Sequence, residues 1–141
     1  MLIRGMNSGM KAICLLALAA LLASSCTKLE GDFAFKKFHD DAYRKIENTP
    51  EFSSDDEIKW VFAFTAKHDQ RDIGVVYLKK ELIWVEMQAY RGKIDPASRI
   101  VYGTIKEFPP GEYQIVLTDV KNNNQEIARK GFIIFAGEVE E

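Results

Sequence analysis

The stretch EIKWVFAFTA, residues 57–66, has apolar side chains at every second position, namely Ile58, Trp60, Phe62, Phe64 and Ala66. A repeat of two residues places such side chains on one face of a β-strand, whereas a helix needs a repeat near 3.6 residues. Lys59 and Thr65 lie between them and would face the other side. We therefore predict a half-buried strand over residues 57–66.

The chain after this strand repeats the same kind of pattern. Further strands are predicted over residues 72–79, 81–91, 98–106, 111–119 and 125–136. Turn-forming residues separate some of them, as in the Asp95-Pro96 pair and the three asparagines at 122–124. Six strands at short spacing, with no helical pattern between them, indicate an all-β antiparallel sandwich or barrel.

The segment PPGEYQIVL, residues 109–117, decides between these two folds. It resembles the E–F corner of immunoglobulin-like domains, where a turn delivers a tyrosine whose hydroxyl bonds back to the backbone. The resemblance implies that Tyr113 is this corner residue. It favours an immunoglobulin-like sandwich of about six or seven strands, with Tyr113, Ile115 and Leu117 in its core.

Residues 33–47, FAFKKFHDDAYRKIE, allow two interpretations. At helical spacing, the apolar positions are Phe35, Phe38, Ala42 and Ile46. Read in twos, Phe33 and Phe35 suit a first strand instead. We favour a short helix or turn here, followed by an edge strand near Phe52.

The first 25 residues have the composition of an export signal. Ala12–Ala23 is an unbroken apolar run of 12 residues, and as a helix it would cover about 18 Å, against about 30 Å for the hydrocarbon core of a bilayer. The run follows two basic residues, Arg4 and Lys11, and ends in small residues. That is the pattern of a secretory signal helix that is later removed. Met1 and Met10 are both possible starts.

Small residues, Ala23-Ser24-Ser25, stand directly before Cys26. In this respect the chain resembles bacterial lipoproteins, whose signal peptide ends in a lipobox. The resemblance implies that the chain is cut before Cys26, and that Cys26 carries a diacylglycerol and a further fatty acid such as palmitate. It also implies a lipid-anchored protein of the cell envelope. Thr27 favours the outer membrane, with the domain periplasmic or surface-exposed. An ordinary signal with an incidental cysteine is the alternative.

Processing at Cys26 would leave a lipidated tether, residues 26–32, and one β-sandwich domain, residues 33–141. Of the 19 basic residues, Arg4 and Lys11 leave with the signal, so 17 remain against 21 acidic ones. This balance argues against nucleic acid as a partner and leaves the membrane, reached through the lipid anchor. With Cys14 removed and Cys26 lipidated, no disulfide is expected in the domain.

Few residues are candidates for catalysis or metal binding. His39 and His68 each lie beside aspartates, but neither stretch has the second His or Cys that a zinc site requires. The acidic run 55–57, and Asp119 with residues 122–124, do not follow the alternating ligand pattern of a calcium loop. We interpret all of them as polar loops. The sequence predicts no enzyme, no metal and no cofactor.

The segment LIWVEMQAY, residues 82–90, is the best candidate for a partner surface. Alternation places Ile83, Val85, Met87 and Ala89 on the core side. It leaves a possible partner surface on the outer side, formed by Leu82, Trp84 and Tyr90. Exposed aromatic side chains can bind a partner, here an envelope protein, or can pair across strands or be covered by residues 35–38.

The sequence thus predicts a membrane-anchored envelope lipoprotein that acts as a binding or accessory module without catalysis. A structural envelope component without a specific ligand is the alternative. A small hydrolase or metal enzyme is less favoured.

Overall fold

The structure is a computed structural model that describes residues 29–138. The strands are β1 (Gly31–Lys37), β2 (Glu51–Ser53), β3 (Ile58–Phe64), β4 (Asp72–Lys80), β5 (Trp84–Lys93), β6 (Ile100–Ile105), β7 (Gly111–Asp119) and β8 (Gln125–Phe135), with one 3₁₀ turn, η1 (Val120–Asn122). The predicted export signal and Cys26 lie outside the described residues. Within residues 29–138 there is no helix of the length and hydropathy that crossing a bilayer requires.

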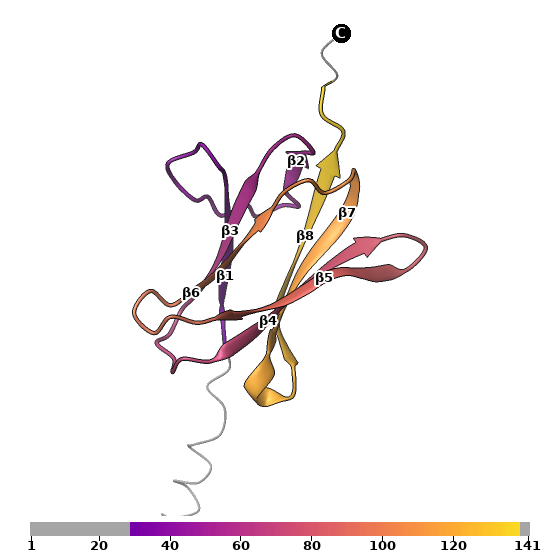
Figure 1. Cartoon of the computed structure of the whole chain (residues 1–141). Coiled ribbons are helices and arrows are strands. Elements are labelled where there is room, and N and C mark those ends of the chain that lie inside the picture. The colour runs from indigo at the N-terminus through magenta and orange to yellow at the C-terminus, as the bar shows by residue number, and fades with distance from the viewer. Residues whose placement is uncertain (1–28, 139–141) are drawn as a thin grey trace, which may run out of the picture.

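The strands form two sheets that face each other (Figure 1). One sheet has the order β1-β3-β6, and the other has the order β2-β8-β7-β4-β5. All neighbouring strands are antiparallel except β2 and β8, which are parallel. Strands β3 and β6 pair as B and E do in immunoglobulin-like domains, while β4, β7 and β8 follow the order C-F-G. The predicted all-β sandwich is confirmed.

The core lies between the two sheets and follows the predicted alternation. The buried side chains of β3 are Ile58, Trp60, Phe62 and Phe64, and those of β7 include Tyr113, Ile115 and Leu117. The ring N–H of Trp60 donates a hydrogen bond of 2.8 Å to the hydroxyl of Tyr77 on the opposite sheet. Ala66 is exposed, because β3 ends at Phe64. The core cluster runs from Leu29 to Ile134, so a chain that begins at Thr27 contains all of it.

The predicted tyrosine corner is present. The hydroxyl of Tyr113 donates a hydrogen bond to the backbone carbonyl of Pro109. The Tyr113 ring is buried and stacks on Phe132, with ring centroids 5.3 Å apart and an interplanar angle of 11°. Phe108, in the turn before β7, packs on the same ring at 5.2 Å. The corner thus joins the β6–β7 connection to the core.

The helix or turn favoured for residues 33–47 is wrong in its first part. Residues 31–37 form β1, which pairs with β3 over its whole length. Phe33 and Phe35 are both buried, so the repeat of two, not the helical spacing, describes this segment. The physical reason is that β1 covers the open edge of β3 and places both rings in the core. The edge strand predicted near Phe52 is confirmed as β2. Leu29, expected in the tether, is buried.

Candidate functional site

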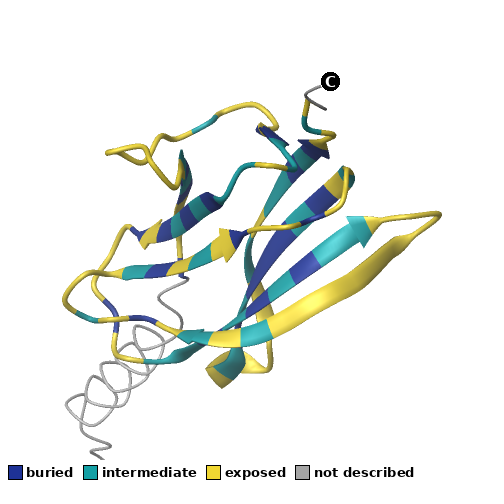
Figure 2. Ribbon diagram, turned by 45° about the horizontal axis from the view of Figure 1, so that its top comes forward, coloured by how far each residue is buried: buried dark blue, intermediate teal, exposed yellow. Residues whose placement is uncertain are grey.

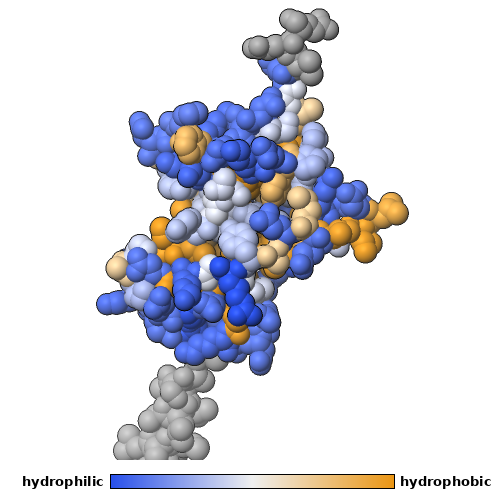
Figure 3. Space-filling model, in the orientation of Figure 1, coloured by the Kyte–Doolittle hydropathy of each residue, from blue (hydrophilic) through white to orange (hydrophobic). Residues whose placement is uncertain are grey.

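The turn between β4 and β5 carries the most exposed apolar side chains of the described chain. We call residues 82–85 the hairpin tip; they are Leu, Ile, Trp and Val. Leu82 is fully exposed, and Ile83 and Trp84 have 73% and 39% of their surface exposed. Figure 2 shows the hairpin extending past the rest of the fold, and Figure 3 shows apolar side chains projecting at this place. Elsewhere the face shown in Figure 3 is mostly hydrophilic.

The charges that flank the hairpin tip are paired. Lys79 forms an ion pair with Glu81 at 3.3 Å, and Lys80 forms one with Glu112 at 3.1 Å. The turn itself is closed by a hydrogen bond of 2.9 Å from the backbone N–H of Glu81 to the carbonyl of Ile83. The tip is therefore an uncharged apolar projection whose charged neighbours largely cancel.

The faces predicted for residues 82–90 need correction. In the pairing of β4 with β5, Tyr77 lies opposite Gln88 and Leu78 opposite Glu86, so Met87 is an extra residue in a β-bulge. A bulge reverses the alternation of side chains along a strand. The set predicted for the core side, Ile83, Val85, Met87 and Ala89, is exposed. The reason is that this part of the hairpin extends past the opposite sheet, so neither of its faces meets the core (Figure 2).

Tyr90 is placed away from the predicted partner surface. Its ring is half-buried against the core, and its hydroxyl lies 3.4 Å from that of Tyr77. Burial raises the pKa of both tyrosines above the ordinary value. Of the three residues predicted to form one surface, only Leu82 and Trp84 lie together, at the hairpin tip. The missed signal was the unbroken apolar run 82–85 directly after two lysines and a glutamate.

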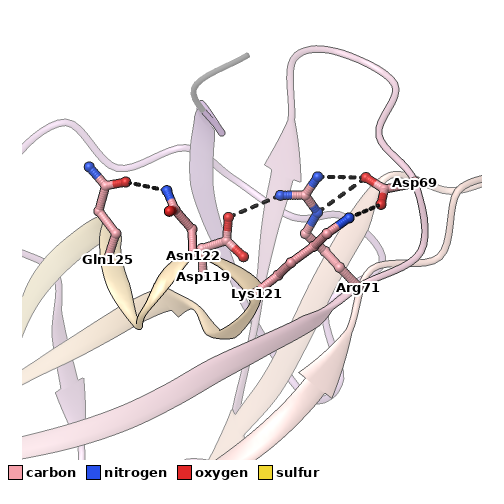
Figure 4. A network of polar contacts seen from close by, with 6 residues as sticks. All are labelled: Asp69, Arg71, Asp119, Lys121, Asn122 and Gln125. Carbon is pink, nitrogen blue, oxygen red and sulfur yellow. Dashed lines mark hydrogen bonds and ion pairs between the residues drawn. The ribbon is translucent and has the colours of Figure 1, made fainter. Parts of the chain in front are cut away.

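A network of ion pairs lies at the other end of the sandwich (Figure 4). Arg71 donates to Asp119 at 3.0 Å and to Asp69 at 2.6 Å, and Lys121 donates to Asp69 at 3.1 Å. The hydrogen bond from Arg71, followed by that from Lys121, lowers the pKa of Asp69 to about 2. Asp119 ends β7 and Arg71 precedes β4, so the network holds the loop before β4 against the end of β7.

The remaining candidate residues do not converge on one site. His68 is buried, with 9% of its surface exposed, and its ring lies 5.8 Å from that of Phe64. Its Nε2 atom and Oδ1 of Asp119 have no hydrogen-bond partner among residues 29–138. His39 lies in the turn directly after β1, beside the ring of Phe38. His68 is therefore a packed side chain and not the solvated loop residue that the sequence suggested.

The acidic run 55–57 lines an open pocket of about 600 Å³ together with His39 and Lys106. Two of its carboxylates are paired, Asp56 with Lys37 at 3.1 Å and Glu57 with Lys106 at 3.6 Å. In the part of the chain that the structure describes, no three His, Cys, Asp or Glu side chains group in a way that could hold a metal ion.

Comparisons with known proteins give little beyond the fold. No protein-family model and no curated protein matches the chain. Among solved structures it is similar to a lytic polysaccharide monooxygenase from Jonesia denitrificans, with 17% identity and a TM-score of 0.41. The match covers 70% of this chain and 63% of that one, so the chain spans less than two thirds of the matched structure.

This comparison corrects the function predicted from the sequence, a binding or accessory module without catalysis. The matched structure is an enzyme, and the statement that this chain has no catalysis is withdrawn. A similarity at this level transfers no activity, substrate or cofactor to the chain either.

Proposed function

We propose that the chain is exported and lipidated at Cys26, and that the lipid holds its β-sandwich at the surface of a cell-envelope membrane. The outer membrane is the proposed site. The observation that supports lipidation is the stretch of small residues, Ala23-Ser24-Ser25, directly before Cys26 at the end of the apolar run. Leu29, only three residues after Cys26, is buried in the core. Three residues span about 10 Å at full extension, so an acyl group on Cys26 would keep the sandwich close to the bilayer.

The energy of such an anchor is sufficient for stable attachment. Each buried methylene group contributes about 0.8 kcal/mol, and two acyl chains anchor a protein where a single one binds only reversibly. A diacylglycerol on Cys26 would supply two chains. The tether between a lipid on Cys26 and the core is only a few residues long, because the first strand starts at Gly31.

The fold defines which end of the sandwich would face the membrane. Gly31, the first residue of β1, lies opposite Phe64, the last residue of β3. The loop after Phe64 contains Asp69 and Arg71, so the ion-pair network lies at the same end (Figures 1 and 4). An anchored molecule would turn this end toward the bilayer and the hairpin tip away from it.

The test is a comparison of the two cysteine variants, since the sequence has only Cys14 and Cys26. Cells are fed a palmitate analogue that can be labelled after lysis. The wild-type protein and Cys14→Ala should carry the label, and Cys26→Ala should not. Label retained on Cys26→Ala, or absent from the wild type, contradicts the proposal. Fractionation alone is a weaker readout, because an uncut signal can also hold the variant in the membrane.

A further inference from the structure

We propose that the hairpin tip inserts into the interface of a zwitterionic lipid bilayer. This contact goes beyond the anchor at Cys26 and does not depend on it. Because an anchored molecule would turn the tip away from its own bilayer, the bilayer that the tip enters is a second one. The four residues of the tip form the only run of consecutive exposed apolar side chains of this kind within residues 29–138, and the fold gives them no cover.

The shape of the tip favours lipid over a protein partner. Trp84 pairs with Lys80 and Val85 with Lys79, so neighbouring side chains point to opposite faces of the hairpin. Both faces are apolar and exposed at once. A flat protein surface would contact one face of this ribbon and leave the other in water. A bilayer surrounds an inserted hairpin and accepts apolar side chains on both faces.

The area of the tip is also too small for a stable dimer. Burying an aliphatic side chain removes roughly 60–120 Å² of apolar surface from water, so the four side chains, of which only Leu82 is fully exposed, offer about 300 Å². A stable protein interface needs about 800 Å² from each partner. The bulge at Met87 further disturbs the edge of β5 along which a second copy would pair. A second copy of the chain is therefore not the expected occupant.

Charge decides the kind of lipid. The tip is uncharged, and its flanking lysines are engaged by Glu81 and Glu112. The loops at the same end of the sandwich carry an excess of carboxylates: Asp56 and Glu57 are paired with Lys37 and Lys106, and Asp40, Asp55 and Glu107 remain. Anionic headgroups would be repelled at low ionic strength. Phosphatidylcholine or another zwitterionic lipid meets the apolar tip without this repulsion.

The expected affinity follows from the number of inserted side chains. Each buried aliphatic or aromatic side chain is worth about a tenfold gain in partition coefficient. Leu82, Ile83 and Trp84 together therefore predict binding about 10³-fold tighter than without them. Even one myristoyl chain, which buries more apolar groups, binds only reversibly, at about 10⁴ M⁻¹. The tip alone would therefore bind reversibly, and binding would be visible at millimolar lipid.

The test uses residues 27–141, which contain the whole core cluster, and phosphatidylcholine vesicles. Trp84 is the reporter, because Trp60 is fully buried and does not respond. Insertion should shift the Trp84 emission to shorter wavelength, and lipids with brominated acyl chains should quench it. The double variant Leu82→Ser/Ile83→Ser should bind about 100-fold more weakly. The matched control is Tyr102→Ser, since Tyr102 is 69% exposed but lies on β6 of the other sheet.

Each outcome of this test either supports or overturns the proposal. Quenching in the wild type and in Tyr102→Ser, but not in the double variant, supports the proposal, as does weaker binding when phosphatidylglycerol is added at low salt. Absence of quenching at millimolar lipid overturns it. A wild-type dimer that is absent in the double variant, together with no vesicle binding by the wild type, would assign the tip to a second copy instead. Since this domain lacks Cys26, failure here leaves the anchor untouched, and loss of the palmitate label leaves this test unaffected.

Discussion

The tyrosine corner allows a quantitative test of the fold. Tyr113→Phe keeps the ring against Phe132 and Phe108 and removes only the hydrogen bond to Pro109. Pro109 is exposed, so water can replace the lost donor, and the free energy of unfolding should fall by about 1 kcal/mol. Tyr113→Ala also removes the buried ring. By analogy with Phe→Ala in protein cores, it should cost about 3–5 kcal/mol.

Urea unfolding followed by far-ultraviolet circular dichroism measures both variants on one scale. The slope of free energy against urea should stay that of the wild type, because the surface exposed on unfolding hardly changes, and only the midpoint should move. Tyr102→Phe and Tyr102→Ala are matched controls on an exposed tyrosine and should lie within about 0.5 kcal/mol of the wild type. If Tyr113→Ala costs no more than Tyr113→Phe, the ring is not part of the core and the corner assignment is wrong.

Two further predictions concern the ion-pair network and the packing between the sheets. Asp69 should titrate with a pKa of about 2 in an NMR titration of its carboxyl carbon. The contribution of its ion pairs to stability is present above pH 3.8 and is lost as the pH falls through 2. Arg71→Met should raise the pKa of Asp69 more than Lys121→Met does. Gly103→Ala should destabilise the fold by about 1–3 kcal/mol, because the new Cβ would lie 2.6 Å from the buried Trp60 ring. Gly131→Ala, whose Cβ meets only a backbone oxygen at 3.8 Å, should be close to neutral when both variants are compared by urea unfolding, and equal losses for both glycines would contradict this account of the packing.

Strands with one buried face could be predicted well from the sequence. In β3 and β7 every second residue enters the core, and β7 spans the predicted residues 111–119. The corner at Tyr113 could also be predicted, because its turn and its tyrosine are adjacent in the chain. These features depend on local alternation and turn chemistry, which a sequence displays directly.

Features that depend on pairing could not be predicted in the same way. The residues of β1 fit both a helix and a strand, and only the open edge of β3 decides between them. The faces of β5 reverse at Met87, because the number of residues between two strands does not reveal a bulge. The contact of Arg71 with Asp119 joins residues 48 positions apart, and it exists only because β4 and β7 are neighbours in this register.

The parallel pair of β2 and β8 sets the order in which the sandwich can be completed. Residues 51–53 have β8 as their only sheet neighbour, and they pair with residues 133–135 near the end of the chain. The two ends of the intervening chain must come together before these strands can form hydrogen bonds, and this closure costs conformational entropy. Sheets built from such distant partners fold in milliseconds to seconds. During synthesis, β2 has no strand to join until β8 has been made. The β2 edge of the five-stranded sheet therefore forms after β8, so β2 is the strand expected to join the sandwich last.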